Sequence, residues 1–117
     1  MNNQDIAFDP QILLLSLDND QELLEDLLSA YVEDAPVRLD TLGQAVSRGD
    51  MNAAMGAAHS LKGMSGVIRV NGLERLALEL ELIAKNGDME QLRTQYAAFE
   101  RVMTRILHQA REYLQHI

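Results

Sequence analysis

The sequence predicts an all-α fold: an antiparallel up-down-up-down four-helix bundle with one short extra helix at the N-terminus. Its 117 residues suit a single domain spanning 1–117, and a hydrophobic content of 47% suffices for one packed core. Good helix formers such as leucine, alanine and glutamate are abundant, whereas aromatic residues make up only 4% and there are two prolines. Apolar residues recur every three or four positions along long stretches, which is the period of an amphipathic helix.

The first helix is expected at residues 10–17. Asp9 is a favourable capping residue, and Pro10 suits the first helical position because its ring presets a helical backbone angle. The preceding residues 1–7 are expected to be flexible. A polar turn follows at residues 18–20.

The second helix is expected to extend from Gln21 to Arg48, with Asp20 as its cap. Pro36 lies inside this stretch and lacks the backbone N–H that a helix interior uses. We therefore expect a kink or a break near residues 33–35. The apolar stripe of this helix comprises Leu23, Leu24, Leu27, Leu28, Tyr31, Ala35, Leu39, Leu42 and Val46.

Two short segments repeat the order glycine, aspartate, methionine: Gly49-Asp50-Met51 and Gly87-Asp88-Met89. In each, the glycine suits the left-handed residue that ends one helix, and the aspartate suits the cap that begins the next. Such tight junctions are typical of antiparallel helical hairpins.

These junctions place three further helices. The third is expected from Met51 to about Ile68, the fourth at residues 72–86 with Asn71 as its cap, and the last from Met89 to near the C-terminus. The core stripe of the third helix comprises Ala54, Ala58, Leu61, Ser65 and Ile68. That of the last helix comprises Leu92, Tyr96, Phe99, Val102, Met103, Ile106, Tyr113 and Leu114.

The net charge of −8 disfavours two classes of partner, nucleic acids and anionic membrane surfaces, because like charges repel. The N-terminus lacks the basic and apolar segments of a signal peptide, and the apolar cluster at residues 12–17 is too short to span a bilayer. There are no cysteines for disulfides or thiol chemistry. A cytoplasmic, monomeric protein is therefore expected.

His59 is the most informative residue of the third predicted helix. At about 100° per residue it lies roughly 140° away from the core stripe, so its imidazole faces solvent. Glycines share that face, although each glycine inside a helix costs about 1 kcal/mol relative to alanine. A bare face of this kind indicates that another protein approaches the imidazole closely. The expected docking site is centred on Met55, Gly56, Gly63 and Gly66.

The residues around His59 suit phosphoryl transfer. A neutral imidazole nitrogen is a good nucleophile toward phosphorus, and the reaction asks the protein mainly for positioning and charge neutralisation. Lys62, one turn further along the helix, can place an ammonium beside a group attached to the ring. Glu81 on the fourth helix is the candidate for holding the other ring nitrogen and so setting the tautomer.

The run His59-Ser60-Leu61-Lys62-Gly63-Met64-Ser65-Gly66, followed by Leu73 and then by Leu80-Glu81, resembles the signature of the histidine-containing phosphotransfer (HPt) domain. That signature reads H-x-L-K-G, a stretch of small residues, a leucine fourteen residues after the histidine, and an L-E pair further on. The flanking residues 33–36, 48–50 and 86–88 also resemble the family, so the resemblance covers nearly the whole chain.

The resemblance implies a role for each matching residue. His59 would accept and donate the phosphoryl group, Lys62 would stabilise it, and Gly63 would leave room for it. Glu81 would bond the ring nitrogen that does not react. The partners would be phospho-aspartates on receiver domains of response regulators or of a hybrid sensor histidine kinase. These receivers carry their own Mg²⁺, so this chain would need no metal or other cofactor.

Arg69 departs from the family pattern, because ten residues after the histidine the family usually has glycine. Two interpretations follow: Arg69 closes the partner surface locally, or it adds a positive contact for the acidic site of the receiver. The conformation of the turn between the third and fourth helices depends on this residue.

Two alternative functions would use the same bundle. One is a module that docks receivers without transferring phosphate, which the complete set of His59, Lys62 and Gly63 disfavours. The other is a bundle that dephosphorylates receivers, which would need an amide or carboxylate beside His59 on its own helix to orient water. The sequence also lacks a glycine-rich nucleotide loop, so autonomous kinase activity is not expected.

His108, Glu112 and His116 are spaced four residues apart on the last predicted helix, a spacing that can hold a metal ion. The favoured interpretation is different, because cationic side chains near the C-terminus of a helix are stabilised by the helix dipole.

Overall fold

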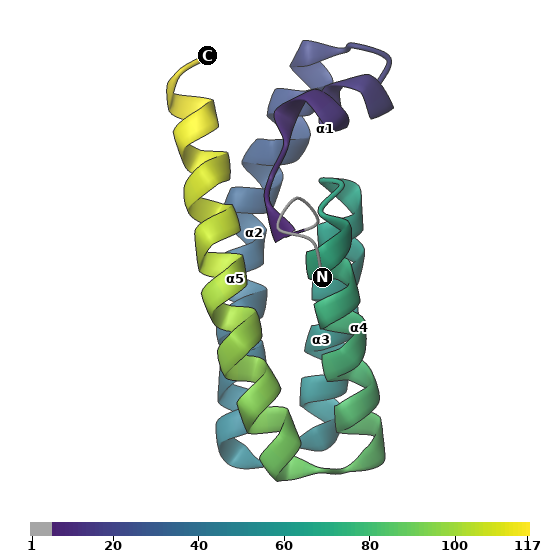
Figure 1. Ribbon diagram of the computed structural model, residues 1–117. Helices are drawn as coiled ribbons and strands as arrows, with labels where there is room; N and C mark the ends of the chain where they lie inside the picture. Colours follow the sequence, from purple (N-terminus) through teal and green to yellow (C-terminus); the bar gives the residue numbers. More distant parts are fainter. Residues whose placement is uncertain (1–5) are drawn as a thin grey trace.

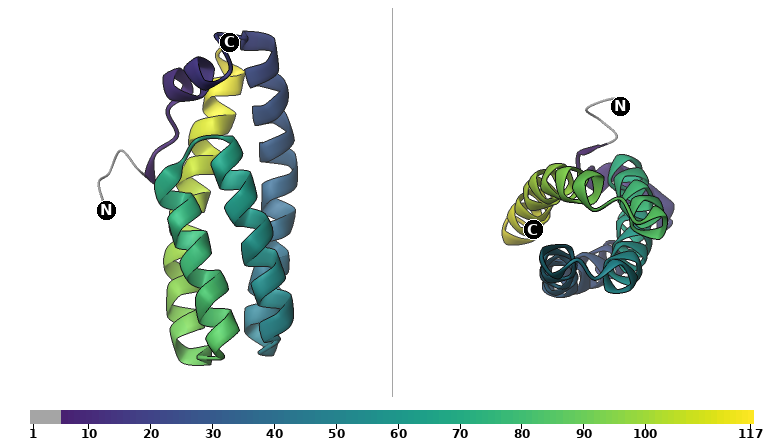
Figure 2. Two further views of the ribbon diagram at one scale, coloured as in Figure 1. Left: turned by 90° about the vertical axis from the view of Figure 1, so that its right-hand side faces the viewer. Right: turned by 90° about the horizontal axis from the view of Figure 1, so that it is seen from below.

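The computed structural model describes residues 6–117, in which the chain forms five α-helices (Figure 1). Their bounds are Pro10–Ser16 for α1, Gln21–Arg48 for α2, Met51–Val67 for α3, Asn71–Asn86 for α4 and Met89–Gln115 for α5. Each long helix packs against the next one along the chain, and α5 closes the ring against α2. The end-on view in Figure 2 shows this ring of four helices. The predicted all-α bundle with one short helix ahead of it is confirmed.

One end of the bundle is built differently from the other. The first part of α2 and the last part of α5 extend beyond the turn between α3 and α4, and α1 lies across this end (Figure 1). Leu13 of α1 is fully buried there, and Phe8 meets the Tyr113 ring edge-on with centroids 6.1 Å apart. Residues 1–5 of the segment predicted to be flexible lie outside the described residues. Ile6 accepts a hydrogen bond from Arg105 at 3.2 Å.

Helix α2 continues without interruption through Pro36, so of the predicted kink or break near residues 33–35 the break is wrong. Proline removes only one backbone hydrogen bond from a helix of 28 residues. Buried residues on both sides of it, including Tyr31, Ala35 and Leu42, pack into the same core. Most helical stability in proteins comes from such packing, which outweighs the single missing bond.

The two glycine–aspartate junctions have the predicted geometry. Gly49 has a φ of 71° and Gly87 a φ of 78°, both in the left-handed region that glycine adopts without steric strain. The side chains of Asp50 and Asp88 cap the following helices and each accept a backbone hydrogen bond at 3.0 Å. These junctions turn the chain back on itself between α2 and α3 and between α4 and α5.

The turn between α3 and α4 is closed by a different arrangement, and the prediction of Asn71 as the cap is wrong. Asn71 is already helical, and Val70 occupies the capping position without any side-chain hydrogen bond. The backbone N–H of Val70 donates to the Ser65 carbonyl at 3.1 Å, and its side chain is only 1% exposed. This is a Schellman turn, with Arg69 at the left-handed position and Val70 after it. Burial of the Val70 side chain stabilises the turn, and no polar side chain caps α4.

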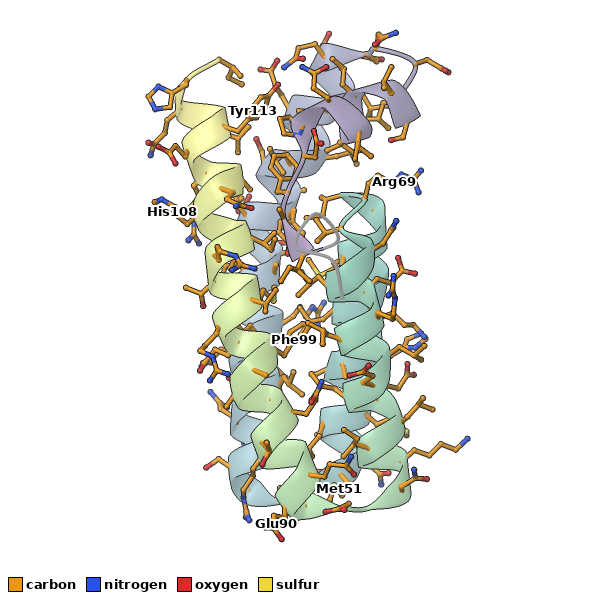
Figure 3. All side chains as sticks on the ribbon, in the orientation of Figure 1. Met51, Arg69, Glu90, Phe99, His108 and Tyr113 are labelled. Atoms are coloured by element: carbon orange, nitrogen blue, oxygen red, sulfur yellow. The ribbon has the colours of Figure 1, made fainter. Side chains whose placement is uncertain are left out.

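Arg69 occupies the left-handed position of this turn, with a φ of 63°. A residue with a Cβ is disfavoured in this conformation, which gives a backbone reason for the glycine usual in the family. The side chain of Arg69 is exposed at the end of the turn, beyond the last residue of α3 (Figure 3).

Arg69→Gly is therefore expected to raise the free energy of unfolding by about 1 kcal/mol, because the left-handed backbone no longer crowds a Cβ. In thermal unfolding the melting temperature should rise by about 4 °C. Arg69→Ala is the matched control, since it removes the same side chain but keeps the Cβ. Equal stabilisation by both substitutions would show that the arginine side chain, and not the backbone angle, carries the strain.

Candidate functional site

Helix α3 presents His59 on the side opposite its core-facing residues, as predicted. The imidazole is 66% exposed. The predicted core stripe is buried along its whole length, from Ala54 to Ile68. Within it, the Ser65 hydroxyl donates to the Leu61 carbonyl at 2.7 Å, so this buried polar group is satisfied inside its own helix. Because the stripe anchors α3 in the core, the position of His59 on the surface is set by the rotation of the helix.

Glu81 of α4 joins His59 and Lys62 of α3 into one cluster. One carboxylate oxygen, Oε2, lies 2.8 Å from His59 Nδ1, and the other, Oε1, accepts a hydrogen bond from Lys62 Nζ at 2.9 Å. The side chains of Glu81 and Lys62 are 19% and 28% exposed, much less than that of His59. The carboxylate therefore fixes the imidazole through one nitrogen and leaves the rest of the ring open to solvent.

The charge state of Glu81 determines which nitrogen of a neutral His59 carries the hydrogen. The hydrogen bond from Lys62, together with that to His59, lowers the pKa of the Glu81 carboxyl below its ordinary value, although partial desolvation opposes the shift. An ionised carboxylate only accepts hydrogen bonds, so Nδ1 of a neutral His59 must carry the hydrogen. The lone pair of the ring is then on Nε2, the nitrogen turned away from Glu81.

The surface around the imidazole is bare at two of the predicted glycines. Gly56 and Gly63 are both exposed, and a Cβ added to either would meet no atom within 4 Å outside its own helix backbone. Packing in the described part of the chain therefore gives no reason for glycine at these two positions. The space that side chains would occupy at Gly56 and Gly63 is therefore open.

The other predicted docking residues are spread more widely. Gly66 is not in open space, because a Cβ there would lie 2.9 Å from Oε2 of Glu74 on α4. Met55 is half-buried and packs against the core beside the exposed face, as do Met51 and Met64. Arg69 lies beyond the end of α3, so it belongs to the rim of any surface centred on His59.

Two features of this region were not predicted from the sequence. One is the ion pair between Lys62 and Glu81, because the sequence predicts a separate role for each of these residues. No pattern in the sequence indicates this ion pair, because it depends on how closely α4 packs against α3. The other is a pocket beside Tyr31, a residue assigned to the core stripe of α2.

The remaining histidines lie away from this cluster. Figure 3 shows His108 on the outer side of α5. Its Nε2 approaches Oε2 of Glu112 at 3.6 Å. Within residues 6–117, no group of three or more histidine, cysteine, aspartate or glutamate side chains is arranged to hold a metal ion. None of the helices in the same range is both long enough and apolar enough to cross a membrane.

The cluster on α3 and α4 thus places an exposed imidazole beside a half-buried cation and a half-buried carboxylate.

Comparisons with known proteins identify relatives of this arrangement. The family model described as the Hpt domain matches residues 26–115. The HPT domain of a sensor hybrid histidine kinase from Shewanella has a similar structure, with a TM-score of 0.86, 17% sequence identity and 97% of each chain covered. Histidine-containing phosphotransfer protein B (HptB) from Pseudomonas aeruginosa superposes with a TM-score of 0.84 and 25% identity, covering 94% of this chain and 96% of its own. A search of curated proteins found no match.

Proposed function

Because this chain belongs to the Hpt domain family, a family of phosphocarrier modules that interact with receiver domains, we propose that it carries a phosphoryl group on His59 in a multistep phosphorelay. His59 accepts the group from a phospho-aspartate of one receiver domain and passes it to an aspartate of another. The observation that supports this most directly is the Nδ1–Glu81 contact of 2.8 Å, which leaves Nε2 as the free, exposed nucleophile.

In the proposed transfer, the lone pair of His59 Nε2 attacks the phosphorus of the acyl phosphate. A nitrogen–phosphorus bond forms while the bond to the aspartate oxygen breaks, and the aspartate leaves as a carboxylate. The ring then carries a positive charge and keeps its hydrogen on Nδ1. That N–H donates a hydrogen bond to the ionised Glu81, which stabilises the charged ring. In the return step a carboxylate of the next receiver attacks the phosphorus, the nitrogen–phosphorus bond breaks, and the imidazole leaves neutral; a Mg²⁺ held by that receiver would supply charge neutralisation.

Lys62 is the cation that this chain contributes. It lies one helical turn from His59, and Glu81 holds its ammonium 2.9 Å from Oε1. A phosphoryl group on Nε2 would bring negative charge next to this ammonium. The Lys62 ammonium then donates to both the Glu81 carboxylate and the phosphoryl group. It neutralises charge on the phosphoryl group while it remains hydrogen-bonded to Glu81.

The direct test is phosphoryl transfer from purified, phosphorylated receiver domains. One cognate receiver should transfer its label to this protein, the label should be acid-labile as expected of phosphohistidine, and a second receiver should remove it. Release of inorganic phosphate without any label on His59 would instead favour a bundle that dephosphorylates receivers. Binding of receivers with neither outcome would favour a docking module that does not transfer phosphate.

Lys62→Ala is expected to slow single-turnover transfer by about 10- to 100-fold, the loss expected for a hydrogen bond to a charged group. Glu81→Ala should slow it by less than about tenfold. Loss of the Glu81 carboxylate frees the Lys62 ammonium to bind the phosphoryl group. The imidazole, no longer hydrogen-bonded to Glu81, still samples the reactive tautomer. Transfer rates measured with one purified phospho-receiver show which of the two variants loses more activity, and melting temperatures serve as the folding control. A greater loss in Glu81→Ala would mean that orientation of the ring matters more than neutralisation of the phosphoryl group.

A further inference from the structure

Tyr31 of α2 has a buried hydroxyl without a hydrogen-bond partner in the described part of the chain. The residue is only 4% exposed, and burial raises the pKa of its phenol well above the ordinary value. The hydroxyl therefore stays protonated and remains a donor. A buried donor without an acceptor is unfavourable, and few occur in folded proteins. Its presence calls for a physical explanation.

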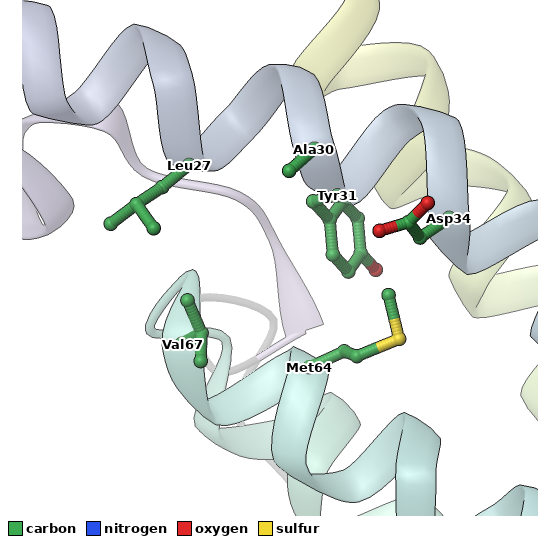
Figure 4. Close-up of a pocket in the computed structure, with 6 residues that line it drawn as sticks. All are labelled: Leu27, Ala30, Tyr31, Asp34, Met64 and Val67. Carbon is green, nitrogen blue, oxygen red and sulfur yellow. The ribbon is translucent and has the colours of Figure 1, made fainter.

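This tyrosine lines an open pocket of about 160 Å³ between α2 and α3 (Figure 4). The α3 side is formed by Met64 and by Val67, which is 49% exposed. The end of Met64 points toward the Tyr31 hydroxyl in Figure 4, and a methionine side chain moves easily. The α2 side is formed by Leu27, Ala30, Tyr31 and Asp34. The pocket is well below the roughly 300 Å³ of a typical small-molecule site, and its size suits a single side chain.

The pocket lies within the reach of a protein docked over His59. Val67 is about 12 Å further along α3 than His59 and about 80° round the helix axis, on the side that faces α2. A typical protein interface covers about 800 Å² on each partner, which is roughly 30 Å across. A footprint of that size centred on the imidazole extends over the bare glycines and over the mouth of the pocket.

We propose that the pocket receives one side chain of the receiver domain that docks over His59, and that this side chain ends in an uncharged carbonyl, as in glutamine or asparagine. The inference rests on the proposed function. The apolar walls suit the stem of such a side chain, and rotation of Met64 exposes the Tyr31 hydroxyl to its oxygen. A carboxylate is disfavoured, because Asp34 on the same wall repels it and burial of a charge is costly.

Tyr31→Phe separates this assignment from a purely structural role. If the receiver supplies the acceptor, the substitution should weaken binding of a cognate receiver about tenfold, as expected for the loss of one buried hydrogen bond. The melting temperature should stay the same or rise, because an unsatisfied group has been removed. Labelling of His59 by phosphoramidate, a small donor that needs no docking surface, should be unchanged.

Tyr96→Phe is the matched control. Tyr96 lies on α5, its hydroxyl donates to Glu100 at 3.1 Å, and it does not line the pocket. This variant should bind the receiver as the parent does. Val67→Glu is the second pocket variant. It adds charge at a half-exposed position and should fold normally. It should weaken binding of the receiver at least as much as Tyr31→Phe does.

Three outcomes would overturn the pocket assignment alone, and a fourth would overturn it together with the proposed function. Parent-like binding by Tyr31→Phe would show that the receiver offers the hydroxyl no acceptor. A clearly lower melting temperature of the same variant would show that the hydroxyl already has an internal partner. Parent-like binding by Val67→Glu would place the pocket outside the interface. Failure of the parent protein to exchange phosphoryl groups with any receiver, despite labelling by phosphoramidate, would overturn the relay function and the pocket assignment together.

Discussion

His59→Gln is expected to stay folded and to accept no phosphoryl group from a phosphorylated receiver. The side chain is 66% exposed and contributes little to the core, so the free energy of unfolding should change by less than about 0.5 kcal/mol. A glutamine amide can still donate to Glu81, but it has no nitrogen with a free lone pair. Label on the protein after incubation with a phospho-receiver should therefore fall below detection, while helicity by circular dichroism is unchanged.

His108→Gln and His116→Gln are the controls for this experiment. Both positions are exposed and lie at the C-terminal part of α5, away from the glycine-bordered surface. Each variant should accept phosphate at the parental rate. Acid-labile label that persists on His59→Gln and disappears from one of these two variants would move the phosphorylation site to α5.

Gly63→Glu is expected to slow transfer at least about 100-fold, since an added carboxylate at an interface repels an approaching phosphoryl group by several kcal/mol. The same change should raise the stability of the protein. Gly63 is exposed, with no atom within 4 Å of an added Cβ, so the side chain is accommodated without a clash. Replacing glycine inside a helix should contribute roughly 0.5–1 kcal/mol. Single-turnover transfer and thermal melting should therefore change in opposite senses.

Gly63→Ala isolates the steric part of this effect. It gives the same gain in helix propensity without a charge, so it should melt higher than the parent and lose less transfer activity than the glutamate variant. Unchanged transfer in Gly63→Glu would contradict the view that the bare face exists for a docking partner.

Much of the fold follows from local signals in the sequence. The period of the apolar residues and the paired glycine and aspartate at residues 49–50 and 87–88 suffice to place the helices within a residue or two. The errors arose where tertiary packing decided the outcome. Pro36 is tolerated because the core holds both halves of α2, and Asn71 is not a cap because burial of Val70 closes the turn.

The site was predictable to the extent that it depends on one helix. The outward orientation of His59 and its spacing from Lys62 follow from helix geometry alone. The sharing of the Glu81 carboxylate depends on how closely α4 packs against α3, which no pattern in the sequence specifies. The same is true of the unpartnered hydroxyl of Tyr31, because a tyrosine on an apolar stripe does not reveal whether an acceptor lies within reach.

The positions of His59, Lys62 and Glu81 have a consequence for the order of folding. All three lie in one hairpin of consecutive helices, and the longer of the two links between them, from His59 to Glu81, spans only 22 residues. Closing so short a loop has a small entropic cost and requires no distant part of the chain. Local contacts of this kind form early in helical proteins. We therefore expect the site to assemble with the α3–α4 hairpin, before α5 closes the ring against α2.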